Sequence, residues 1–201
     1  MEKAMNWLKL LACSVIFAWN TQIKRLMNDA MKQIAIKYGT YLALLNISYI
    51  LYAYLVDASV FTATWPGIVL FFLAIGFGIF SVGKFKQSNE GYATFKEAFS
   101  TYILTGIVAT LIGTAFTVLL FSIIDPEFAV QTMDLIVETT YERFESSGMS
   151  DEQIEQIISR IEGSNAFGIA GQLKSAAFSV MFNAIIALIV GAAMKKNNPA
   201  L

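Results

Sequence analysis

The chain has 201 residues, of which 56% are hydrophobic and only 14% are charged, whereas an average soluble domain carries about 25% charged residues. A net charge of −1, a single cysteine and no histidine argue against a basic nucleic-acid-binding face, a disulfide-stapled domain, and histidine-based catalysis or zinc binding. The composition therefore indicates a chain surrounded by lipid rather than by water.

The first 37 residues are expected to be an N-terminal extension with a basic lead-in. Its uncharged run, residues 10–23, is too short to cross a bilayer, which takes about 20 apolar residues. No small-residue cleavage site follows the run, so it does not resemble a signal peptide. We interpret the residues before Met27 as dispensable or not translated, with Met27 or Met31 as alternative starts.

Residues 38–196 are expected to form one membrane domain, followed by a polar tail at 197–201. Uninterrupted apolar runs of this length favour helices over the shorter, alternating strands of a membrane barrel. The sequence therefore predicts an all-α fold, an integral membrane four-helix bundle. The four predicted spans are residues 38–56, 66–83, 98–124 and 175–194.

Residues 125–174, between the third and fourth spans, are predicted to form an acidic, extracytoplasmic helical hairpin. Apolar residues recur at three- and four-residue steps before and after the Ser146-Ser147-Gly148 break, as on one face of each of two helices. Ser150 and Gln153 have the spacing of a capping box at the start of the second helix. The segment carries ten of the 15 carboxylates, which we interpret as solvated helix faces rather than a cation site.

Basic residues set the orientation, because lysine and arginine favour the cytoplasmic side of a membrane. All but three of the 14 lysines and arginines lie before the first span, in the 84–97 link or after the fourth span. Both termini are therefore expected in the cytoplasm. The three exceptions, in the acidic segment, are Arg143, Arg160 and Lys174.

The predicted spans carry polar and small residues but no charge. We interpret Asn46 and Asn183 as interhelical polar contacts, and the small residues of the third span as helix-packing positions. The alternative is a polar pathway along the same residues. These small residues are Gly106, Thr110, Gly113 and Thr114.

The expected function is that of a non-enzymatic structural or partner-binding membrane protein, with no catalytic, cofactor-binding or metal-binding residues. Its expected partners are the lipid bilayer and a membrane or periplasmic protein, with no nucleic acid. The alternative is a small-solute transporter or channel acting as a homo-oligomer, because four short uncharged helices are expected to enclose little interior. An intramembrane enzyme ranks last, since no motif nominates a reaction.

The order of several motifs resembles a family of bacterial four-span membrane proteins, the domain of unknown function 4199. The resemblance covers roughly residues 32–196, and it implies a multi-pass protein of the bacterial inner membrane. It implies no activity, substrate or catalytic residue. The motifs are Lys37-Tyr38-Gly39, residues 91–99 (GYATFKEAF), Asp125-Pro126-Glu127-Phe128, residues 149–155 (MSDEQIE) and the lysines that end the fourth span.

Overall fold

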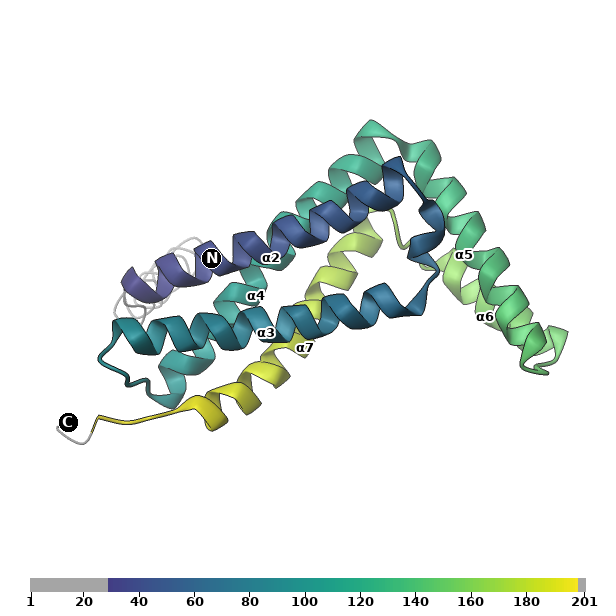
Figure 1. Ribbon diagram of the computed structural model, residues 1–201. Coiled ribbons are helices and arrows are strands. Elements are labelled where there is room, and N and C mark those ends of the chain that lie inside the picture. Colours follow the sequence, from purple (N-terminus) through teal and green to yellow (C-terminus); the bar gives the residue numbers. More distant parts are fainter. Residues whose placement is uncertain (1–28, 199–201) are drawn as a thin grey trace, which may run out of the picture.

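A computed structural model describes residues 29–198 of the protein. The predictions about the segment before Asp29 and about the last residues of the tail lie outside the described residues. Over the described range the chain forms a bundle of long helices with a helical hairpin at one end (Figure 1). The predicted all-α bundle, with a hairpin between its third and fourth long helices, is confirmed.

Four helices are long and apolar enough to cross a membrane. They are α2 (Asp29–Leu55), α3 (Thr64–Ser88), α4 (Phe95–Val118, continued by the π-helical turn η2, Leu119–Ile124) and α7 (Ile169–Met194). α2 begins nine residues before the predicted span, because Met31 and Ala35 already face the core, where they are 0% and 1% exposed. Residues 29–37 are thus part of the bundle.

α4 is the central helix and packs along both α2 and α7, while α3 packs on α2 and α4 (Figure 1). We call one end of the bundle the basic end; it holds the start of α2, the α3–α4 connection and the end of α7. The opposite end is the hairpin end. Large apolar side chains cover the outside of all four helices, as expected for surfaces in hydrocarbon; Phe72 on α3 and Ile189 on α7 are each 65% exposed.

The half of the bundle nearest the basic end, the basic half, is closely packed. The Tyr102 ring of α4 lies directly against Gly78 of α3, and a Cβ at Gly39 of α2 would lie 2.7 Å from the carbonyl oxygen of Thr105. The glycines of α2 and α3 thus let these helices approach α4 closely, and larger side chains of α4 fill the space opposite them. The fully or nearly buried core here is Met31, Val82, Phe85, Ala93, Ala98, Tyr102, Ala187 and Val190.

The basic end itself is held by backbone and capping interactions. Thr94 and Glu97 form a capping box at the start of α4, in which the Thr94 amide donates to Glu97 Oε2 at 2.8 Å. Ala93 and Lys196 exchange backbone hydrogen bonds of 2.9 and 2.7 Å. Lys86 Nζ donates to the carbonyl oxygen of Met194 at 3.0 Å, which satisfies a carbonyl at the end of α7.

The hairpin consists of α5 (Pro126–Ser146) and α6 (Asp151–Gly163), packed on each other and projecting from the bundle (Figure 1). Gly148 turns the chain between them with φ of 80°, a left-handed conformation that glycine adopts without strain. The predicted capping pair is present: the Ser150 amide donates to Gln153 Oε1 at 3.4 Å.

Asp125 joins the hairpin to the bundle. Its carboxylate accepts from the Phe128 amide at 2.9 Å, which caps α5, and from the Tyr54 hydroxyl of α2 at 3.0 Å. Around it, aromatic rings of α2, of the short helix η1 (Ala58–Phe61), of η2, of α5 and of the segment before α7 pack together. These rings, which we call the aromatic cluster, are Tyr54, Phe61, Phe121, Phe128 and Phe167.

Candidate functional site

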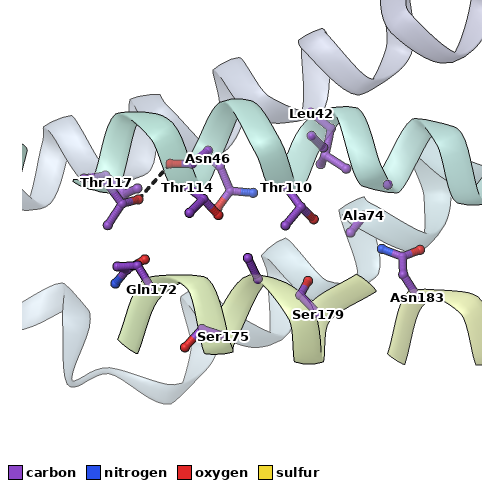
Figure 2. A pocket seen from close by; sticks show the side chains of 15 residues that line it. Leu42, Asn46, Ala74, Thr110, Thr114, Thr117, Gln172, Ser175, Ser179 and Asn183 are labelled. Atoms are coloured by element: carbon purple, nitrogen blue, oxygen red, sulfur yellow. Dashed lines mark hydrogen bonds between the residues drawn. The ribbon is translucent and has the colours of Figure 1, made fainter. Parts of the chain in front are cut away.

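A cavity of about 270 Å³ lies between the four long helices (Figure 2). Its walls come from α2, α4 and α7, with Ala74 of α3 closing the back. We call it the polar cavity, because more than half of its lining side chains carry a hydroxyl or an amide. These polar residues are Asn46, Thr110, Thr114, Thr117, Gln172, Ser175, Ser179 and Asn183.

Helical spacing explains why these side chains share one space. On α7, Gln172, Ser175, Ser179 and Asn183 follow at steps of three and four residues, so they form one stripe along the helix. On α4, residues 110, 113, 114 and 117 form a matching stripe. Figure 2 shows the threonines of α4 pointing toward α7, and Gln172 and Ser179 of α7 pointing toward α4, with Asn46 beside them.

Most of these polar groups have no hydrogen-bond partner in the part of the chain that the structure describes. Thr117 donates to the carbonyl oxygen of Gly113 at 2.8 Å, and Gln172 donates to that of Ala166 at 2.8 Å. Among residues 29–198 the other six side chains form no hydrogen bond, and each is at least partly accessible. In hydrocarbon each such group costs up to several kcal/mol, so the cavity favours a hydrogen-bonding occupant.

The cavity is deep in the bundle and uncharged. Asn46, Thr110 and Asn183 all lie within a few residues of the midpoints of their candidate spans. None of the described residues that line the cavity is an acid or a base. The lining therefore offers hydrogen-bond donors and acceptors without net charge, which suits a neutral polar molecule better than an ion.

The basic half closes the cavity at one end. Thr105 directly precedes Gly106 of the cavity lining, and Ser81 lies two turns beyond Ala74 on α3. Both are at most 1% exposed, and their hydroxyl oxygens are 2.9 Å apart. Beyond them comes the buried ring of Tyr102. These side chains fill the seam between α3 and α4 on the basic side of the cavity.

Towards the hairpin end the bundle is more open. α3 and α7 meet at Phe71 and Phe182, whose ring centroids are 6.1 Å apart, and diverge beyond this crossing (Figure 1). Ser175 and Ser179 of α7 are exposed there. Solvent therefore reaches the cavity lining at Ser175 and Ser179, on the hairpin side, and the aromatic cluster lies one turn beyond Thr117.

The structure brings all six residues singled out from the sequence to this one region. Asn46 and Asn183 line the cavity but do not form a hydrogen bond with each other. Gly106 lies against the Asn183 amide, since a Cβ at Gly106 would lie 2.7 Å from Asn183 Nδ2. Thr110, Gly113 and Thr114 form the cavity wall, and a Cβ at Gly113 would meet nothing within 4 Å. The helix-packing role predicted for these residues stays a prediction.

Two points of the sequence reasoning need correction. The expectation that four short helices enclose little interior is wrong, because the polar cavity lies within a single chain. The residues Gln172, Ser175 and Ser179 were missed as site residues. Their three- and four-residue spacing with Asn183 was the available signal, and it marks a polar stripe on an otherwise apolar helix.

Two titratable groups outside the spans are shifted by their neighbours. Hydrogen bonds from Ser59, first from its hydroxyl and then from its amide, lower the pKa of Asp57 in the α2–α3 link. In the hairpin, the negative charge of Asp151, followed by that of Glu145, raises the pKa of Tyr141. Neither Asp57 nor Tyr141 lines the polar cavity, so the two shifted groups are not part of the site.

Comparison with known proteins gives one match. The family model described as a protein of unknown function, DUF4199, matches residues 37–196. No curated protein and no solved structure matches the chain. The matched range includes all four candidate spans except the first turns of α2, together with the hairpin and the whole lining of the polar cavity. The chain belongs to the domain of unknown function 4199 family.

Proposed function

We propose that this chain is a non-enzymatic, multi-pass membrane protein that binds a small uncharged polar solute in the polar cavity and carries it across the bilayer. The observation that carries the proposal is the set of six polar cavity side chains that form no hydrogen bond within residues 29–198, of which Asn46, Thr110 and Asn183 lie near the midpoints of their spans. A bilayer cannot satisfy these groups, so a bound solute or water must do so.

Two further features support transport over a purely structural role. Towards the basic end the buried side chains of Ser81, Thr105 and Tyr102 fill the seam next to the cavity, whereas Ser175 and Ser179 are exposed on the hairpin side. A site reached from one side and sealed from the other is the arrangement that alternating access requires. In this proposal, transport requires the layer at Ser81, Thr105 and Tyr102 to open while the hairpin side closes. The other long helices would move against α4, which packs on all three of them.

The proposal includes an orientation in the membrane. We place the protein in the inner membrane of a bacterium with both termini in the cytoplasm and the hairpin outside. The support is the distribution of lysines: Lys84, Lys86 and Lys96 flank the α3–α4 connection, and Lys195 and Lys196 follow α7. In this orientation the cavity opens towards the outer leaflet.

The first experiment measures whether the cavity is reached by water. In a Cys13→Ser background, single cysteines replace Thr114 or Ser175 in the cavity, Ile189 on the lipid face, or Ala187 in the core. A membrane-impermeant methanethiosulfonate reacts with thiolate, which needs water to form. We expect cysteines at the two cavity positions to react at least tenfold faster than those at 187 and 189. Equal rates at all four positions contradict the proposal.

The second experiment measures flux with defined probes. Purified protein in liposomes is exposed to gradients of glycerol or urea, and swelling is followed by light scattering. We expect solute entry faster than in protein-free liposomes, and a return to that background in Asn46→Leu and Asn183→Leu. Ser48→Leu is the matched control, because Ser48 donates to the carbonyl oxygen of Leu44 at 2.8 Å and does not line the cavity.

The second candidate function is partner binding through the hairpin. The observation in its favour is that α6 packs on α5 and projects from the bundle, with exposed carboxylates such as Glu152 and Glu155 (Figure 1). This candidate predicts that a co-purifying protein is lost in Glu152→Lys/Glu155→Lys while solute flux is unchanged. Loss of flux in Asn46→Leu without loss of a partner favours the transporter.

A further inference from the structure

An apolar groove of about 580 Å³ runs along the outer face of α3, away from the polar cavity. Most of its lining comes from α3 itself, including Ile68, Phe72 and Phe80, which are 52%, 65% and 52% exposed. Gly76 forms its floor, since a Cβ there would meet nothing within 4 Å. Tyr38 of α2 closes the groove at its basic end.

The length of the groove matches one leaflet of a bilayer. Twelve residues separate Ile68 from Phe80, which corresponds to about 18 Å along a helix. Half of a hydrocarbon core that is ~30 Å thick is about 15 Å. Gly76 is the midpoint of α3, so an acyl chain that enters at the basic end passes Phe80 and Phe77 and reaches Gly76 near the membrane midplane.

Two cations stand where the groove ends. The rings of Tyr38 and Phe80 meet edge to face with centroids 5.3 Å apart. Lys37 Nζ lies 5.9 Å from the Tyr38 centroid, and Lys84 Nζ lies 5.3 Å from the Phe80 centroid. Both ammonium groups are thus adjacent to the same pair of rings, one turn or less beyond the apolar lining.

Neither lysine forms an ion pair with another described residue. Over residues 29–198 the one ion pair joins Lys32 and Asp29, and Lys84 donates to the neutral Gln87 Oε1 at 3.0 Å. An ammonium group has three donors, so both lysines retain donors for an anion. Lysines next to an apolar groove at a membrane surface favour anionic headgroups, by about 1 kcal/mol each.

We propose that this groove binds an anionic phospholipid, with one acyl chain along α3 over Gly76 and the phosphate held by Lys37 and Lys84. The charge at the basic end identifies the occupant, because a second copy of α3 would bring a second Lys84 to the same place. The site is separate from the polar cavity and does not depend on solute transport.

Native mass spectrometry of the full chain in detergent tests the headgroup. Phosphatidylglycerol and phosphatidylcholine are titrated in parallel, and bound lipid is counted. We expect tighter binding of phosphatidylglycerol, and a loss of about 30-fold in Lys37→Gln/Lys84→Gln, as two surface lysines supply. The matched control Lys96→Gln/Lys195→Gln removes two exposed lysines of the same end, and it should leave the affinity within twofold.

The groove itself is tested with Gly76→Leu, which fills its floor, against Ala177→Leu on an exposed position of α7. We expect Gly76→Leu to weaken binding of phosphatidylglycerol at least tenfold and Ala177→Leu to leave it unchanged. Equal affinity for the two lipids, or no effect of the lysine substitutions, overturns the proposal. So does a dimer that Gly76→Leu dissociates, since that identifies a second copy as the occupant. Competition by millimolar inorganic phosphate overturns the acyl-chain part.

Discussion

The two halves of the bundle use the same four helices but pack them differently. In the basic half, Gly39 and Gly78 are pressed against α4, and the hydroxyls of Ser81 and Thr105 meet each other. In the half nearest the hairpin, which we call the hairpin half, Gly113 has open space around it, and Thr110 and Thr114 form no hydrogen bond with any described residue. Composition alone does not separate these regions, since both contain glycine, serine and threonine.

In the basic half, large side chains lie opposite small ones. Tyr102 faces Gly78, and Phe99 faces Gly191, where a Cβ would lie 3.3 Å from the Phe99 Cβ. Where two small side chains meet there, as at Ser81 and Thr105, a hydrogen bond of 2.9 Å joins them. In the hairpin half, polar stripes on α4 and α7 face each other without a large apolar side chain between them, and the polar cavity lies there.

The largest effect is expected when glycine is replaced by alanine in the basic half, compared with the same substitution in the hairpin half. Gly78→Ala places a methyl group in the Tyr102 ring, and we expect the free energy of unfolding to fall by about 1–3 kcal/mol. Gly113→Ala meets nothing within 4 Å and should leave it unchanged or raise it by up to ~1 kcal/mol. Thermal unfolding in detergent measures both. Equal losses in the two variants would break the comparison.

Asp125 tests whether the hairpin end opens independently of the basic half. Asp125→Ala removes the cap of α5 and the bond from Tyr54, and we expect a loss of about 1–2 kcal/mol confined to the hairpin end. Hydrogen exchange should quicken in the first turn of α5 and not at residues 98–106. Tyr54→Phe, which keeps the cap, should have a smaller effect. Acceleration throughout the bundle would contradict local opening.

Two capping boxes provide a matched pair across the division. Thr94→Ala removes the cap of α4, and we expect about 1 kcal/mol of lost stability, seen as a lower global melting temperature. Ser150→Ala acts on α6, which packs chiefly on α5, and should quicken exchange in α6 alone. A lower global melting temperature in both variants would show that the hairpin unfolds together with the bundle.

The smallest expected effect depends on pH. Because the folded pKa of Asp57 is lowered by Ser59, its contribution to stability is present above the ordinary aspartate pKa of about 3.9. It is lost as the pH falls through the lower folded value. The difference in melting temperature between wild type and Asp57→Ala should therefore be a few degrees or less at pH 7 and shrink below pH 4. A difference that grows on acidification has the wrong sign.

The sequence was sufficient for the fold. Long apolar runs without alternation form helices in a bilayer, and the capping pair Ser150 and Gln153 marks where α6 begins. Helix ends were harder to place. α2 and α7 extend beyond the apolar runs, since residues such as Met31 and Gly171 gain burial from packing that hydropathy does not register.

The site was predicted only in part. Asn46 and Asn183 are visible as amides in apolar runs, and the sequence left open whether they pack or line a pathway. Their distance from one another depends on how α2 and α7 sit around α4, which no periodicity encodes. Ser175 was assigned to the edge of a span, although it belongs to the same stripe as Asn183. The cavity is a property of two facing stripes, and each stripe alone resembles ordinary packing.

The π-helical turn at Leu119–Ile124 has a consequence for how the hairpin is aimed. The Asp125 amide donates to the Leu120 carbonyl oxygen at 2.8 Å, five residues back, so the turn holds one residue more than an α-helix would. Each residue of an α-helix advances the direction of the chain by about 100°. Deleting one residue here would swing α5 and α6 to a different side of the bundle and carry Asp125 away from Tyr54. The one extra residue of the π-helical turn thus sets the direction in which α5 and α6 project from the bundle.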